Sequence, residues 1–98
     1  MKKGIITAFA LSLISMGAIA MEPPAKSNTC VACHGADGNS LAPNFPKIAG
    51  QHAAYLEKAL KDYREGLRRN SMMAPFARDL TNEEIKALAE FYSKQTPK

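Results

Sequence analysis

The sequence predicts an all-α domain of about three main helices joined by two long loops. Apolar residues recur at positions three and four apart in residues 51–65 and 81–94, and such positions share one face of a helix. No segment alternates between polar and apolar residues as a half-buried strand does. The intervening stretches are rich in glycine and proline, which is typical of loops.

The first twenty residues are predicted to lie outside this domain. Met1-Lys2-Lys3 is a basic start, residues 5–14 are mostly apolar, and Ala18-Ile19-Ala20 matches the small-residue cleavage site of a secretory signal. We therefore expect residues 1–20 to be a cleaved signal peptide, residues 21–98 to form the domain, and the periplasm to be its location. The alternative is a retained membrane anchor, since the uncharged run over residues 4–21 approaches the length that spans a bilayer.

Size and charge exclude several classes of function. Removal of residues 1–20 leaves 78 of the 98 residues, and a core of that size rarely supplies more than about 3–5 kcal/mol, so a further staple is expected. The formal net charge falls from +4 to +2 without Lys2 and Lys3. The only basic cluster is Arg64 with Arg68 and Arg69, so neither nucleic-acid binding nor direct membrane binding is predicted.

A short helix is expected near the start of the domain. Pro23 and Pro24 suit a leader that enters a helix, and Ser27 or Asn28 can cap a helix that runs through Cys33 and His34.

The spacing of the two cysteines carries the main chemical signal. Cys30 and Cys33 enclose two residues and are followed at once by His34. Although a cysteine pair in the oxidising periplasm usually forms a disulfide, this pattern is typical of c-type haem attachment. Both sulfurs lie on one side of a helical turn and can form thioethers to one edge of a porphyrin, so that His34 lies under the ring and can bind the iron. The pattern predicts one covalent haem c.

Two other interpretations of the cysteine pair have less support. A redox-active pair is expected after a strand in a βαβ unit, and no such unit is predicted. A zinc site needs a fourth ligand and usually a second close pair, for which His52 is the only further candidate.

The rest of the chain is predicted as loop, helix, loop and helix. Residues 35–50 form a long loop, and loops of this length tend to be functional. A helix over residues 51–65 stops at Gly66, and a second loop covers residues 67–79. Thr81 and Glu84 form a capping-box pair that begins the last helix, which ends near Lys94.

Three residues are candidates for a second axial iron ligand, namely Met72, Met73 and His52. A methionine in a small protein often only fills the core. These two methionines lie in a predicted loop with no helical face to join, which favours a ligand role. His52 begins the middle helix and is expected to face solvent or to hydrogen-bond a haem propionate.

Four segments together resemble the class I c-type cytochromes, especially the small bacterial cytochromes of the c4 and c553 types. The segments are residues 30–39, 42–51, 72–75 and 80–85, and the resemblance covers nearly all of residues 21–98. It implies the cytochrome c fold, with helices and long loops wrapped round one covalent haem.

The same resemblance assigns roles to single residues. The ligand methionine of these cytochromes stands seven residues before the leucine that precedes the last helix, which selects Met73 over Met72 because that leucine is Leu80. Pro46 matches the proline whose carbonyl accepts a hydrogen bond from the iron-bound histidine, although it can also simply stiffen a turn. Ile48 matches the residue that packs on the ring face.

These residues predict an electron carrier and not an enzyme. With His34 and Met73 on the iron, no position is open for oxygen or a substrate, and the soft thioether raises the reduction potential. The expected partners are redox proteins, by resemblance a quinol-oxidising complex upstream and an oxidase or reductase downstream. No small-molecule substrate is expected, and membranes are reached only through partner complexes.

Two further expectations concern the protein's surroundings. Cationic side chains near the loops are expected to steer an acidic partner; they are Lys47, Arg64, Arg68, Arg69 and Arg78. The alternative function is a ligand-binding or peroxidase-like haem protein in which Met73 leaves the iron.

Overall fold

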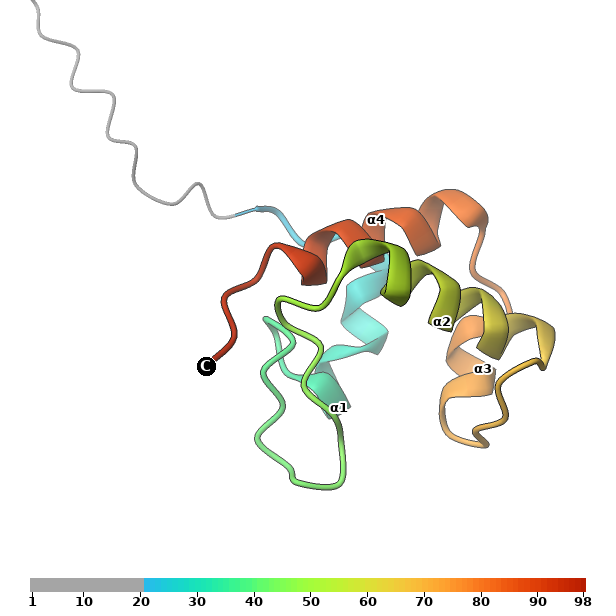
Figure 1. The fold of residues 1–98 in the computed structure, drawn as a ribbon, viewed down its shortest axis with the longest axis horizontal. Coiled ribbons are helices and arrows are strands. Elements are labelled where there is room, and N and C mark those ends of the chain that lie inside the picture. The colour runs from blue at the N-terminus through green and yellow to red at the C-terminus, as the bar shows by residue number, and fades with distance from the viewer. Residues whose placement is uncertain (1–20) are drawn as a thin grey trace, which may run out of the picture.

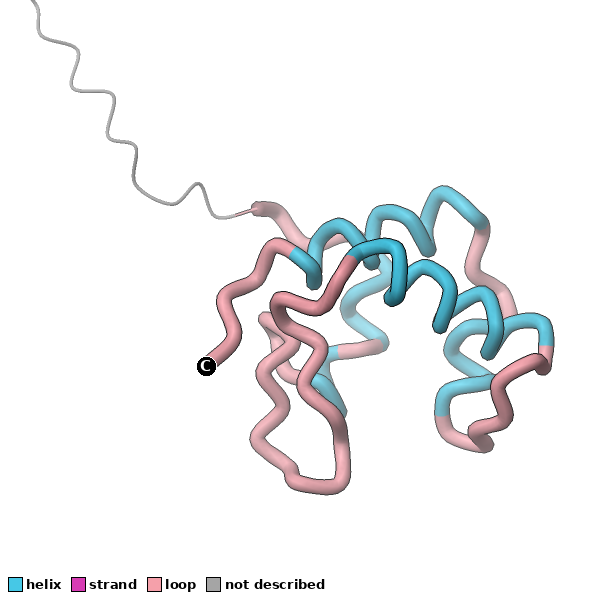
Figure 2. The backbone as a smooth tube through the Cα atoms, viewed as in Figure 1, coloured by secondary structure: helices cyan, strands magenta, loops and turns pink. Residues whose placement is uncertain are grey.

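The computed structural model describes residues 21–98, and the predicted signal peptide lies outside them. This part of the chain contains helices and no strand (Figure 2). In chain order the elements are the 3-10 helix η1 (Ala25–Thr29) and the α-helices α1 (Val31–His34), α2 (Ala53–Glu65), α3 (Met73–Ala77) and α4 (Asn82–Ser93). The predicted all-α class is confirmed.

The N-terminal helix is shorter and begins earlier than the sequence predicts. Pro24, with φ of −58°, precedes η1, and no side chain caps that helix. Ser27 lies buried inside η1, so the predicted cap at Ser27 or Asn28 is wrong. The reason is that Pro24 already holds the φ that begins a helix. α1 is a single turn that ends at Gly35, whose φ of 81° suits glycine.

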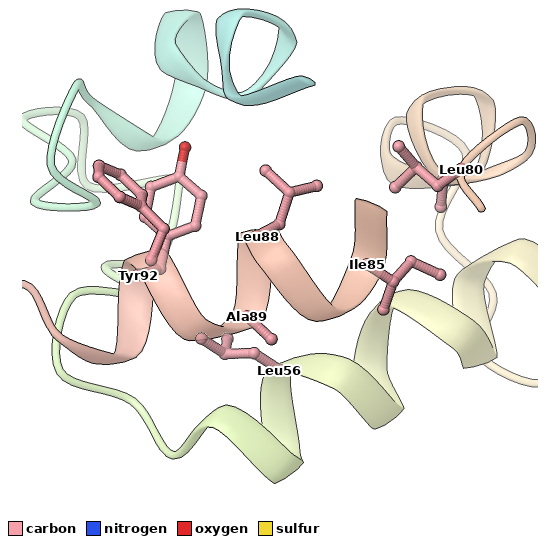
Figure 3. Close-up of a cluster of buried hydrophobic side chains, with 8 residues drawn as sticks. Leu56, Leu80, Ile85, Leu88, Ala89 and Tyr92 are labelled. Atoms are coloured by element: carbon pink, nitrogen blue, oxygen red, sulfur yellow. The ribbon is translucent and has the colours of Figure 1, made fainter. Parts of the chain in front are cut away.

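The two long helices pack side by side and build the core (Figure 1). Figure 3 shows Leu56 of α2 facing Ala89 of α4, with Ile85 and Leu88 on the same helix. Ile85 and Leu88 are almost fully buried, and burial of such a side chain contributes about 1.5–3 kcal/mol. α2 and α4 therefore form the scaffold on which the shorter elements are held.

The predicted start of α4 and the predicted end of α2 are confirmed. At the start of α4 the Thr81 hydroxyl accepts the Glu84 amide proton at 3.1 Å, and the Glu84 carboxylate accepts the Thr81 amide proton at 2.9 Å. At the end of α2, Gly66 is left-handed with φ of 76°, and its amide donates to the Asp62 carbonyl. α2 begins two residues later than expected, at Ala53.

The second predicted loop contains a helix that the sequence did not reveal. α3 spans Met73–Ala77, and Pro75 is tolerated because it lies in the first turn, where its missing amide proton is not needed. The Asn70 side-chain oxygen accepts the amide protons of Met72 and Met73 at 2.9 and 3.0 Å. Asn70 thereby fixes the start of this short helix.

Arg64 has a structural position and is not a free surface cation. Its guanidinium donates to the Leu80 carbonyl at 3.0 Å and pairs with Glu65 at 2.9 Å. It ties the end of α2 to the residue before the α4 cap. The expectation that Arg64 steers a partner is therefore not supported.

The loop over residues 35–50 is fastened to the end of α4 and to the tail. The Gly50 amide donates to the Tyr92 carbonyl at 2.9 Å. The buried Asn39 side chain donates to the Thr96 carbonyl at 3.0 Å and accepts from the Lys98 amide at 2.9 Å. These bonds connect residues more than forty positions apart and fix a loop that has no helix of its own.

A prediction on acid stability follows from Asp37 in this loop. Its carboxylate accepts the Asn39 amide proton at 3.0 Å and lies 3.1 Å from the Lys98 ammonium. The hydrogen bonds from Asn39, followed by Lys98, lower the pKa of Asp37 to about 2. A carboxyl with a lowered folded-state pKa adds stability above its unfolded pKa of about 4, and that stability is lost as the pH falls towards 2.

We therefore expect Asp37→Asn to lose less stability than the wild type as the pH falls from about 4 to about 2. Urea unfolding of the holoprotein across this range measures the difference, in which acid effects common to both proteins cancel. Asp79→Asn is the control, because Asp79 makes no hydrogen bond or ion pair within residues 21–98. Parallel pH profiles for Asp37→Asn and the wild type would contradict the assignment.

Candidate functional site

A cavity of about 310 Å³ lies between α1, the loop around residues 44–48, α2, α3 and α4. Apolar side chains form much of its wall, including Leu56, Leu60 and Leu88. All six residues singled out by the sequence line it, namely Cys30, Cys33, His34, Pro46, Ile48 and Met73. His52 does not line it; this residue is exposed and precedes the first turn of α2.

His34 is held in a defined orientation at the cavity wall. It is the last residue of α1 and is buried, and its Nδ1 lies 2.8 Å from the Pro46 carbonyl oxygen. A carbonyl can only accept, so Nδ1 carries the proton and donates it. The neutral ring then has its lone pair on Nε2, the form that binds a metal. Gly35, with its positive φ of 81°, turns the chain directly after His34 and allows the loop to return with Pro46.

The two cysteines lie on the turn that leads into His34. Both are partly buried and neither is in a disulfide. Burial raises the pKa of the Cys30 thiol, whereas redox-active Cys-x-x-Cys pairs have a lowered pKa. Within residues 21–98 no three His, Cys, Asp or Glu side chains gather as a metal site. The position and chemistry of this pair favour covalent attachment over thiol redox chemistry.

The two methionines differ in exposure. α1 and α3 lie on opposite sides below α2 and α4 in Figure 1, and both contribute to the cavity wall. Met73 is the first residue of α3 and is partly buried, while Met72 is 54% exposed. Both backbone amides donate to the Asn70 side chain. The two residues therefore differ in the exposure of their side chains and not in how their backbones are held. This difference favours Met73 as the sulfur that reaches across the cavity.

Tyr92 is a site residue that the sequence indicated only as part of the core. Figure 3 shows its hydroxyl pointing from α4 towards the N-terminal helices. The residue lines the cavity, and its buried hydroxyl makes no hydrogen bond of normal geometry in the described part of the chain, with the Cys30 thiol as its polar neighbour. Burial raises the pKa of this phenol, to which the neighbouring Cys30 adds, so the hydroxyl stays protonated. The signal for this role in the sequence was that a buried helical face carries a tyrosine, with its polar hydroxyl, and not a phenylalanine.

These features are suited to a covalently bound haem. An apolar wall, two sulfurs on one turn, an imidazole with a free Nε2 and a thioether on another element match the attachment points and ligands of haem c. A buried hydroxyl with no well-formed hydrogen bond is rare, and it is consistent with a further group in this cavity. This arrangement does not require His52 as an iron ligand.

Comparisons with known proteins agree with this geometry. The family model described as cytochrome c matches residues 25–95. Cytochrome c-554(548) of Halomonas halodenitrificans is 48% identical over 73 residues, which cover 71% of this chain and 88% of that protein. Cytochrome c4 of Thiocapsa roseopersicina is 49% identical over 72 residues, which cover 72% of this chain and 37% of that protein.

A solved structure gives the same result in three dimensions. The cytochrome c4 of Acidithiobacillus ferrooxidans matches with a TM-score of 0.64 and 34% identity, covering 74% of this chain and 40% of that one. The chain therefore spans less than half the length of the cytochrome c4 relatives that it matches.

Proposed function

The chain belongs to the cytochrome c family, so it carries one covalent haem c and transfers electrons, and we propose that it does so in the periplasm with His34 and Met73 as iron ligands. The haem supplies an iron that changes between the ferric and ferrous states. The observation that carries the proposal is the meeting of the Cys30-x-x-Cys33-His34 turn and Met73 at one cavity.

Each residue of the site has a separate task in this proposal. Cys30 and Cys33 provide the thioether bonds, and His34 provides Nε2 to the iron. The Pro46 carbonyl fixes the imidazole and raises its basicity, while Ile48 packs on the ring face. The Met73 thioether favours ferrous iron and raises the potential.

The alternative of a ligand-binding or peroxidase-like protein lacks a distal catalytic group. Such chemistry needs an acid or base beside an open iron position. His52 is the only histidine besides His34, but it is exposed and outside the cavity. With His34 and Met73 as its two ligands the iron would have no open position for such chemistry, which is consistent with an electron carrier.

Location and partners extend the proposal beyond the site. We assign residues 1–20 to a cleaved signal peptide and residues 21–98 to the exported domain. No helix within residues 21–98 is long and apolar enough to cross a bilayer. The partners are redox proteins, for which we propose a quinol-oxidising complex as donor and an oxidase or reductase as acceptor, met through small and transient contacts.

Carbon monoxide distinguishes the carrier from the ligand-binding alternative. We expect the ferrous spectrum of the wild type at neutral pH to stay unchanged under carbon monoxide, because Met73 occupies the position that the gas needs. Met73→Ala should bind the gas and is the positive control, while Met72→Ala should behave as the wild type does. Binding by the wild type as readily as by Met73→Ala would favour the ligand-binding function.

A further inference from the structure

The charges at the cavity are all of one sign. Lys47 and Arg68 line it, and no aspartate or glutamate does. A haem carries two propionate carboxylates on the edge opposite the vinyl groups that the cysteines take. A carboxylate that leaves water needs a cationic or hydrogen-bonding partner. The cations of the cavity wall are therefore the places to look for a propionate site.

Lys47 is already engaged by the protein. Its ammonium donates to the backbone oxygen of Lys98 at 2.6 Å. This bond directs the Lys47 side chain to the tail of the chain, so Arg68 is the cation of the wall that is left for a carboxylate.

The backbone brings Arg68 back over α2. Gly66 turns the chain, and the amides of Leu67 and Arg68 both donate to the Asp62 carbonyl, at 2.9 and 3.1 Å. These bonds fix the backbone of Arg68 against the last turn of the helix. Its side chain can then extend along the face of α2 that borders the cavity.

Two tyrosines of α2 hold the guanidinium in place. Arg68 donates from Nη1 to the Tyr55 hydroxyl at 3.2 Å. The guanidinium carbon lies 4.9 Å from the centroid of the Tyr63 ring, a distance at which the cation and the ring attract each other. No carboxylate of residues 21–98 forms an ion pair with Arg68. Most of its five N–H donors thus stay available, in the planar fork that matches a carboxylate.

We propose that Arg68 binds one haem propionate through charge-assisted hydrogen bonds, with Tyr55 and Tyr63 as the residues that position it. The inference rests on the function proposed above, since it assumes the haem attached at Cys30 and Cys33. It assigns the two neighbouring arginines different tasks. Both side chains are exposed, but only Arg68 lines the cavity, so Arg69 remains a surface cation that can steer a partner.

The proposal has a consequence for the pH dependence of the reduction potential. An adjacent cation lowers the pKa of a carboxyl by about 1–3 units, so Arg68 keeps the propionate ionised at neutral pH. Ionisation of this group stabilises ferric iron, and the potential falls as the pH rises through its pKa. The titratable or charged groups that face the same region are His34, Lys47, Tyr55, Asp62, Tyr63 and Tyr92.

The test measures reduction potential from about pH 3 to about pH 9, a range that includes the ordinary pKa of a carboxyl, in holoprotein of the wild type, Arg68→Gln and Arg69→Gln. We expect a flat profile near neutral pH for the wild type and for Arg69→Gln. Arg68→Gln should show a fall in potential that lies about 1–3 pH units higher than the fall in the wild type. Arg68→Lys should lie between them, because it keeps the charge and loses the fork.

Oxidation by ferricyanide, a small anion, gives a second readout. The rate of this oxidation should fall with added salt in the wild type. Arg69→Gln should weaken the salt dependence more than Arg68→Gln does, because the propionate already neutralises the charge of Arg68 in the wild type. Equal effects of both substitutions on the pH profile and on the salt dependence would overturn the proposal.

Two controls keep this result separate from other failures. A variant that lacks the His and Met spectrum in the oxidised state points to a fault in the proposed iron ligation, whereas an intact spectrum with no change in the pH profile overturns the propionate site alone. If Arg68→Gln yields too little holoprotein, Arg68→Lys and Tyr55→Phe serve in its place. In each of these variants the potential should fall at a higher pH than in the wild type. If it falls at the wild-type pH in both variants, the propionate site is overturned.

Discussion

Met73→Ala is expected to abolish the weak far-red sulfur-to-iron band of the oxidised protein and to lower its reduction potential by at least about 0.1 V, within the roughly 0.8 V that axial ligands span. The physical reason is that the thioether stabilises ferrous iron, and the variant leaves that position to water. Optical spectroscopy and a potentiometric titration measure the two effects.

Met72→Ala is the matched control for this experiment. Met72 lines the same cavity and shares the Asn70 cap with Met73, but it is mostly exposed. Its replacement should leave the band and the potential close to those of the wild type. Loss of the band in Met72→Ala with retention in Met73→Ala would exchange the roles of the two residues.

Gly38→Ala is expected to destabilise the holoprotein by about 2–5 kcal/mol. Gly38 has φ of 82°, where a residue with Cβ pays about 1–2 kcal/mol. A Cβ at this position would lie 2.9 Å from the Ala49 backbone nitrogen, 3.0 Å from the Tyr92 ring and 3.1 Å from the Ile48 side chain. Such overpacking adds typically about 1–3 kcal/mol.

The expected damage reaches the site because Gly38 fastens the loop that carries Pro46. Its carbonyl accepts the amide protons of Ile48 and Ala49 at 2.8 and 3.1 Å. Urea unfolding of the holoprotein measures the loss. Gly66→Ala is the matched control, since Gly66 has φ of 76° and open space around it; only the backbone cost of about 1–2 kcal/mol is expected. Equal losses in the two variants would show that the contacts at Gly38 carry no weight.

The parts of the fold that sequence predicts well are those with local signals. The capping pair Thr81 and Glu84, the stop at Gly66 and the apolar faces of α2 and α4 each depend on residues within a few positions of one another. The haem motif is local as well, because Cys30, Cys33 and His34 act within one helical turn.

What the sequence did not reveal depends on contacts between distant residues or on very short elements. α3 has five residues and is capped by Asn70 from outside the helix, which periodicity cannot detect. The fastening of Asn39 to Thr96 and Lys98, and the return of Arg68 to Tyr55, join segments whose pairing no local pattern indicates.

Arg64 and Tyr92 illustrate the same limit at the level of single side chains. Residue type and helical position alone place Arg64 on the charged surface and Tyr92 on the apolar face of the last helix. Arg64 instead bonds the Leu80 carbonyl, and Tyr92 brings a buried hydroxyl to the cavity. Only the packing of α2 and α4 against their neighbours determines these roles.

The most direct test of one covalent haem in an exported domain is the intact mass of the protein purified from the periplasm, combined with a pyridine haemochrome assay. We expect the mass of residues 21–98 plus one haem, and one haem per chain in the assay. A chain without haem in which Cys30 and Cys33 form a disulfide would contradict the central conclusion.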